Sequence, residues 1–167
     1  SGADQSDVRL GPLFIDLQEA TNPAIAKNAE AQIWAIWHET PDDKSLQIMR
    51  DARRSLNAKD FDSAISSLNQ LVAYAPTYAE AWNQRAIVLF LARDYSGALR
   101  DIAQTLLLEP RHFGALSGRG QVYLQLDEPE LALEAFEAAL DRNPRMDNIR
   151  QQIAMVRAYL NGKQKPI

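Results

Sequence analysis

Apolar and small residues recur every 34 residues between positions 48 and 136 of the chain. Two of the recurring columns hold large apolar residues, and two hold alanine or glycine. Within each copy the apolar positions follow the i, i+4-type spacing of one helix face. A small residue at a fixed place lets two antiparallel helices approach closely, because a larger side chain would push them apart. The columns are Ile48–Trp82–Leu116, Leu68–Ile102–Phe136, Ala52–Ala86–Gly120 and Ala64–Ala98–Ala132, and they predict a helix pair that occurs three times.

Prolines mark the end of each copy at the same spacing. Pro76, Pro110 and Pro144 lie 34 residues apart, and each follows the second helix of its pair. A proline ring clashes with the preceding helical turn, so each proline is expected to stop that helix. The turns between paired helices are expected at 59–60, 93–94 and 127–128, and five columns at one period identify repeats at 45–78, 79–112 and 113–146.

The copies resemble the tetratricopeptide repeat. The resemblance covers 45–146 and is carried by AEAWNQRA at 79–86, DYSGAL at 94–99 and Glu109-Pro110. It implies an all-α fold, in which antiparallel helix pairs stack into a right-handed superhelix with a concave groove lined mainly by the first helix of each pair. It also implies a non-enzymatic scaffold or adaptor that binds a protein or peptide partner. The alternatives are a self-associating structural protein, possible as a homo-oligomer, and a regulatory subunit of a cell-envelope enzyme.

Two further segments flank the repeats. Residues 10–44 reproduce the alternation of small and large residues, and Pro41 precedes Pro76 by 35 residues, one out of register. We interpret this segment as a degenerate fourth copy that buries Trp34 and Trp37 on its inner faces; an unrelated helical hairpin is the alternative. Residues 147–160 predict an amphipathic capping helix that stops at Asn161-Gly162 and turns Arg150, Gln151, Gln152 and Arg157 to solvent. Residues 1–9 and 161–167 are interpreted as tails.

The family resemblance also implies which residues line the groove. Asn83 and Gln84 would hydrogen-bond an extended peptide backbone, since each amide offers a donor and an acceptor. Arg50 and Arg53 would pair with a carboxylate. The alternative for each residue is a solvated helix face. The candidate lining is Met49, Arg50, Arg53, Leu56, Asn83, Gln84, Ile87, Phe90, Gly114, Ser117, Gly118, Gln121 and Leu124.

Two glycines in that lining bear on the kind of partner. Some tetratricopeptide cochaperones hold a C-terminal carboxylate with basic residues and Asn from three successive repeats. Here Gly114 and Gly118 stand at the third-repeat positions, so such a clamp is not expected. Gly in a helix interior costs about 1 kcal/mol relative to Ala. One hypothesis is that the two glycines form a floor for a partner; in the alternative, Gly114 sits at a helix start and Gly118 relieves crowding.

The composition offers little material for catalysis. The chain has no Cys and only two His, His38 and His112, so we expect no metal site, no cofactor and no enzyme activity. His112 is interpreted as a loop or helix-terminus residue. A net charge of −4 argues against nucleic acid, and the apolar runs are too short for a membrane span.

The N-terminal region carries most of the acidity and the one indication of compartment. Residues 1–44 hold eight Asp/Glu against three Lys/Arg, while 45–167 hold fourteen against fifteen. The run DVRLGPLF at 7–14 resembles the mature start of small exported bacterial tetratricopeptide proteins. It predicts a periplasmic location, with a cytoplasmic one as the alternative, and the start at Ser1-Gly2 rather than Met predicts a processed or tag-derived N-terminus.

Overall fold

The computed structural model describes residues 7–163, and all regular secondary structure in that range is helical. The helices are α1 (Leu10–Glu19), α2 (Pro23–Trp37), α3 (Asp43–Asn57), α4 (Phe61–Tyr74), α5 (Ala79–Leu91), α6 (Tyr95–Leu108), α7 (Phe113–Gln125), α8 (Pro129–Arg142) and α9 (Asp147–Lys163). The predicted tails at 1–6 and 164–167 lie outside the described residues.

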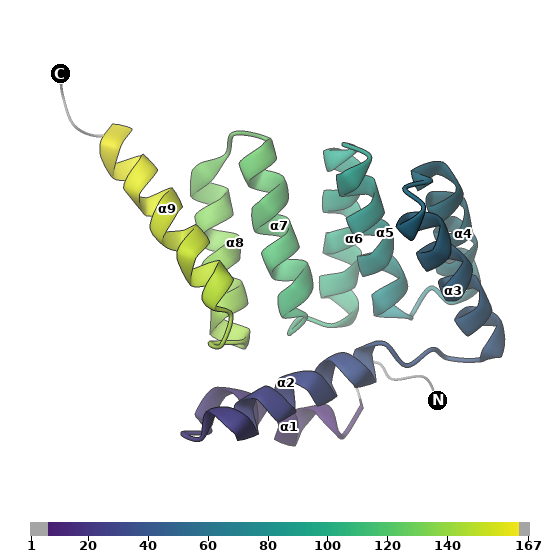
Figure 1. The fold of residues 1–167 in the computed structure, drawn as a ribbon, viewed down its shortest axis with the longest axis horizontal. Coiled ribbons are helices and arrows are strands. Elements are labelled where there is room, and N and C mark those ends of the chain that lie inside the picture. Colours follow the sequence, from purple (N-terminus) through teal and green to yellow (C-terminus); the bar gives the residue numbers. More distant parts are fainter. Residues whose placement is uncertain (1–6, 164–167) are drawn as a thin grey trace.

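Helices α3 to α8 form three antiparallel hairpins that stack side by side (Figure 1). The small-residue columns lie where paired helices meet: Ala64, Ala98 and Ala132 are fully buried. A Cβ at Gly120 would lie 2.4 Å from Cε1 of Phe136, the large residue of its own hairpin. Close helix approach therefore depends on these positions, and the predicted all-α array of helix pairs is confirmed.

The helices of each pair end and begin at the predicted turns. Asp60 and Asp94 cap α4 and α6 by accepting hydrogen bonds from the backbone N–H groups of Ser63 and Gly97. The preceding turns contain Lys59, Arg93 and Asp127, which have φ values of 58°, 65° and 56°. A left-handed residue lets the chain leave one helix and enter the next within a short turn. The turns at 59–60, 93–94 and 127–128 thus repeat one backbone conformation.

Helix α9 packs its apolar face against the last hairpin. Ile149, Ile153 and Val156 are buried in a cluster with Ala132 and Phe136 of α8. The helix continues through Asn161 and Gly162 to Lys163, so the predicted stop at Asn161-Gly162 is wrong. A Cβ added at Gly162 would meet no atom within 4 Å outside the helix's own backbone, so the helix passes this position without a close neighbour.

The N-terminal hairpin of α1 and α2 does not stack on α3 as a preceding repeat would. It lies across one end of the array, below α5 to α8 in Figure 1. Phe14 and Trp37 pack against Phe113 at the start of α7. The interpretation as a stacked fourth copy is therefore wrong, because the aromatic face of the hairpin packs on the start of α7 and not on α3. Both tryptophans are still covered: Trp37 is buried and Trp34 half-buried.

Polar contacts hold the hairpin in place as well. The Gln18 amide donates to the carbonyl oxygens of Asp141 and Arg142 at the end of α8. The Arg145 guanidinium donates to the Ala20 carbonyl oxygen, and the Arg111 guanidinium lies 4.8 Å from the centre of the Phe14 ring. The hairpin is thus joined to the end of α8 and to two loops, all of them far from it in the sequence.

Candidate functional site

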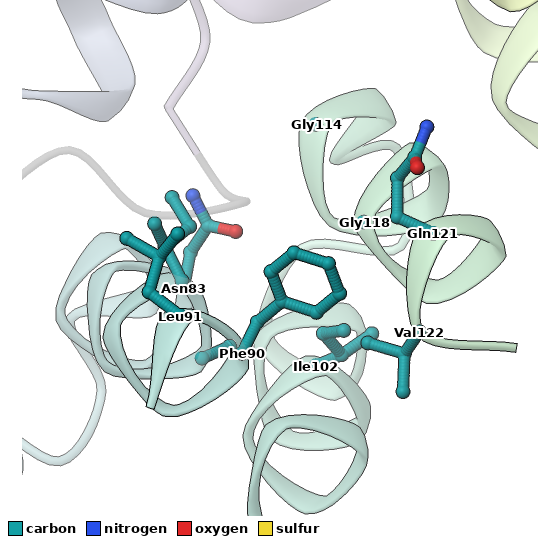
Figure 2. A pocket seen from close by; sticks show the side chains of 10 residues that line it. Asn83, Phe90, Leu91, Ile102, Gly114, Gly118, Gln121 and Val122 are labelled. Atoms are coloured by element: carbon teal, nitrogen blue, oxygen red, sulfur yellow. The ribbon is translucent and has the colours of Figure 1, made fainter. Parts of the chain in front are cut away.

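A largely apolar cavity lies between α5 and α7, on the face of the array that the first helices of the pairs form. Its volume is about 290 Å³. Figure 2 shows the Phe90 ring between the two helices, with Ile102 and Val122 below it and to its right in the view. The lining residues are Asn83, Ala86, Ile87, Phe90, Leu91, Ile102, Gly114, Gly118, Gln121 and Val122.

Six of the predicted groove residues line this one cavity: Asn83, Ile87, Phe90, Gly114, Gly118 and Gln121. Ile87 and Leu91, one turn apart on α5, are 40% and 45% exposed. Exposed aliphatic side chains beside an apolar cavity are typical of a binding surface. The predicted groove lining did not include the other four lining residues, Ala86, Leu91, Ile102 and Val122. Leu91 was recognisable as the residue four positions after Ile87, whereas Ile102 comes from the second helix of the pair.

The other predicted residues lie elsewhere. Met49, Arg53, Leu56 and Gln84 line a shallow depression between α3 and α5. Met49 is buried and belongs to the core there, while Arg50 is exposed one position further along α3. The Ser117 hydroxyl donates to the Gly114 carbonyl oxygen within α7.

Leu124 lines a second cavity, of about 310 Å³, between α7 and α9. Met155 and Tyr159 of α9 form its other side and are 66% and 48% exposed. Gln152 and Met155 stand 34 residues after Gly118 and Gln121. The 34-residue spacing of the groove-lining positions therefore continues into α9. Gln152 was instead predicted to face solvent on the capping helix, and no groove position was predicted on α9.

Glu80, in the first turn of α5, is a buried carboxylate beneath the groove that the sequence analysis did not single out. Its oxygens accept hydrogen bonds from Nδ2 of Asn83 at 3.2 Å and from Nε2 of Gln84 at 2.6 Å. His112 Nε2 lies 3.0 Å from Oε2 of Glu80, and His38 Nε2 lies 3.4 Å from Oε1. Residues at the end of α2, within α5 and at the start of α7 therefore converge on one side chain.

The surroundings of Glu80 keep it ionised. Burial alone raises the pKa of a carboxyl group, but hydrogen bonds from His112, His38 and Gln84 outweigh burial and lower the pKa of Glu80 to about 2. His112 Nδ1 accepts the backbone N–H of Ala115 at 3.0 Å and caps α7, so Nε2 carries the proton that is donated to Glu80. The expected helix-terminus role of His112 is present, together with a buried contact to Glu80.

His112 also lies against the N-terminal hairpin. Its ring stacks on Trp37 with centroids 4.2 Å apart and an interplanar angle of 10°. A Cβ at Gly114 would lie 2.5 Å from Cη2 of Trp34. Gly114 is therefore needed for the close approach of the hairpin, besides its place at a helix start.

Gly118 has no such neighbour. A Cβ at this position would meet only Cδ1 of Ile102, at 3.8 Å, which is ordinary van der Waals contact. The alternative that Gly118 relieves crowding is therefore wrong. Its place in the cavity lining agrees with the floor hypothesis, whose binding role stays a prediction.

Two classes of site are not found in the part of the chain that the structure describes. Residues 7–163 contain no group of three or more His, Cys, Asp or Glu placed to hold a metal ion. No described helix combines the length and apolar character that crossing a bilayer requires.

Helix pairs that stack side by side, with cavities along the face that their first helices form, define a helical-repeat solenoid. Family models of the tetratricopeptide repeat match residues 50–107 and 92–161. A TPR repeat-containing protein of Rhizobium etli is 32% identical over 154 residues, which cover 92% of this chain and 76% of the relative. The chain belongs to the tetratricopeptide repeat family.

Solved structures support the same fold. The TPR2B domain of yeast Sti1, in a complex with pHsp70, has a TM-score of 0.65 at 18% identity, covering 71% of this chain and 99% of that domain. The Sgt2 TPR domain from Aspergillus fumigatus has a TM-score of 0.69 at 17% identity, covering 77% and 89%. At this level of identity the likeness concerns the fold alone.

Proposed function

We propose that this protein is a non-enzymatic binding module that holds a segment of a partner protein in its concave groove. The observation that carries the proposal is the apolar cavity between α5 and α7, flanked by exposed Ile87 and Leu91. Transfer of a partner's aliphatic side chain into it would remove apolar surface from water at about 25 cal/mol per Å². The complex of the Sti1 domain with pHsp70 supports the same use of the fold.

The proposal does not include a clamp for a C-terminal carboxylate. Such a clamp needs N–H donors and cations at several groove positions. Here the amide nitrogen of Asn83 is bonded to Glu80, and Gly114 and Gly118 offer no side chain. The partner segment is therefore expected to bind mainly through apolar contact and through groups other than its terminus.

A selection from a random-peptide display library, in which both ends of each peptide are joined to linkers, tests the proposal. Selected peptides should lose at least about tenfold in affinity for Ile87→Lys, because a charge in an apolar site is costly to desolvate. Leu107→Lys is the matched control, since Leu107 on α6 is 71% exposed and does not line the cavity. Selected peptides that bind Ile87→Lys as tightly as the unaltered protein would overturn the proposal, as would a selection that yields no binder.

A further inference from the structure

Glu80 determines which way two groove amides point. An ionised carboxylate has only acceptors to offer, and it receives the NH₂ groups of Asn83 and Gln84. The amide nitrogens therefore face Glu80, and the amide oxygens face away from it. Figure 2 shows the Asn83 oxygen turned toward α7 at the edge of the cavity and its nitrogen turned away. Within residues 7–163, no hydrogen bond reaches the side-chain oxygen of Asn83 or of Gln84.

The two oxygens lie on different sides of the α5 groove face. Asn83 lines the cavity toward α7, and Gln84 lines the depression toward α3. A partner that crosses α5 must therefore supply hydrogen-bond donors at this point. In a helix the N–H groups beyond the first turn are bonded to the helix's own carbonyl oxygens, whereas an extended segment has N–H groups available along its length.

The positive charge at the α3 end of the groove also restricts which residues a partner can place there. Arg50 and Arg53 are exposed on α3, and neither forms an ion pair with another described residue. They are the only ionisable side chains among the predicted groove positions, in a protein whose net charge is −4. Because these two cations lie at one end of the groove in an otherwise acidic protein, an acidic residue of the partner is favoured beside them.

We infer that the groove binds an extended, internal segment of a partner protein, which donates backbone N–H groups to Asn83 and Gln84. An aliphatic side chain of the segment occupies the cavity between α5 and α7, and an acidic side chain pairs with Arg50 and Arg53. Neighbouring first helices lie on the order of 10 Å apart, so the cavity between α5 and α7 lies about one and a half such spacings, roughly 15 Å, from α3. An extended chain rises ~3.3 Å per residue. The acidic residue thus stands roughly four or five positions from the aliphatic one. The inference rests on the proposed function and specifies the partner of the same site.

Amide-to-ester replacement in a selected peptide is the direct test, because it removes one N–H group and leaves the side chains in place. The probes are the peptides selected against the unaltered protein, resynthesised with both termini blocked. One or two ester positions beside the aliphatic residue should weaken binding by about fivefold to tenfold, the usual contribution of one hydrogen bond. Each such ester should have no effect on binding to the one leucine variant, Asn83→Leu or Gln84→Leu, that lacks the acceptor of the removed N–H group.

Gln121→Leu is the matched control, since Gln121 lines the same cavity and, within the described residues, forms no hydrogen bond with Glu80. Binding to this variant should keep the full ester effect. Should Asn83→Leu fail to fold, the half-buried Gln84 provides the second variant. A charge reversal of Arg50 and Arg53 to Glu should weaken the same peptides, and Lys in place of their acidic residue should restore binding.

The outcomes separate this inference from the proposed function. Peptides that bind in the groove but show no ester effect would overturn the inference and leave the function in place. The same holds for peptides whose ester effect persists in both leucine variants, or that carry no acidic residue. A selection without any groove-dependent binder would overturn both.

Discussion

Glu80 takes part in several polar contacts that the sequence did not predict. It accepts hydrogen bonds from two groove amides and from His112, and it lies beside His38 of the N-terminal hairpin. A fully buried carboxylate would be costly without these partners. Its ionised state therefore links the orientation of the groove amides to the contact between the hairpin and the array.

The stability of the protein should depend on the charge of Glu80 in acid. Its pKa in the folded protein is about 2, against an ordinary value of 4.5. A lowered folded pKa contributes stability above the unfolded value, and this contribution is lost as pH falls toward the folded value. The contribution is on the order of a few kcal/mol. Urea unfolding of Glu80→Gln should show a lower stability at neutral pH and a weaker decline between about pH 4.5 and 2.

An exposed carboxylate provides the comparison for that experiment. Glu134 on α8 is exposed and forms no ion pair with the described residues, so Glu134→Gln should keep the pH profile of the unaltered protein. If Glu80→Gln declined as steeply in acid as the unaltered protein, the buried ionised state would be contradicted.

The two groove glycines should respond in opposite ways to alanine. A Cβ at Gly114 would lie 2.5 Å from Trp34, and one at Gly118 would lie 3.8 Å from its nearest neighbour. Gly114→Ala should destabilise the protein by about 1–3 kcal/mol through overpacking. Gly118→Ala should stabilise it by up to about 1 kcal/mol through helix propensity. Chemical denaturation measures both, and the affinity of selected peptides for Gly118→Ala tests the floor hypothesis: higher stability with unchanged binding would contradict it.

At the scale of elements, the three hairpin turns share a conformation that their sequences do not favour. Lys59, Arg93 and Asp127 all have positive φ, a region that costs a residue with a Cβ roughly 1–2 kcal/mol. Glycine adopts it without that cost. The array therefore retains a small conformational strain at Lys59 and Arg93, whereas Asp127 is of a type that adopts this region more readily.

Replacement of Arg93 by Gly should raise the free energy of unfolding by a few tenths to about 1 kcal/mol, the relief of strain less the entropy that Gly adds to the unfolded chain. Ala92→Gly is the control, because Ala92 has φ −77° and gains nothing from glycine. That variant should be destabilised in the same thermal or urea measurement. Equal effects of the two variants would argue against the left-handed turn at Arg93.

At the scale of the whole molecule, the N-terminal hairpin closes one end of the array instead of lengthening it. It touches the start of α7 through Phe113 and the α8–α9 loop through Met146 and Arg145. These contacts join parts of the chain that no repeat interface joins. We expect the hairpin to open as a unit when its aromatic contacts are weakened.

Trp37→Ala should increase amide hydrogen exchange in α1 and α2 while α3 and α4 stay protected. Trp37 packs on Phe14, Phe113 and His112, and removal of a buried aromatic side chain costs about 3–5 kcal/mol. Trp82→Ala is the control of the same residue type, since Trp82 packs in the cluster of α3 to α5 and should leave the hairpin protected. Uniform loss of protection in every helix after Trp37→Ala would contradict an independently opening hairpin.

The sequence by itself determined the repeat, the helix pairs and most helix ends. These features depend on residues close together in the chain, such as a proline after a helix or Asp60 and Asp94 as caps, and the period of 34 residues reports them directly. It also identified six residues of one cavity, because the face of a regular helix follows from spacing. The partner's identity and the periplasmic location stay predictions.

Only the tertiary structure decided where the hairpin docks and which way the groove amides point. Both depend on contacts between residues such as His38, Glu80 and His112, which come from three helical hairpins and have no common spacing. The need for Gly114 likewise comes from Trp34, eighty positions earlier in the chain. A periodic pattern indicates which helix faces are buried, but it does not indicate which distant side chain covers them. At Glu80 the side chains that surround the carboxylate determine which hydrogen-bonding atoms the groove presents to a partner.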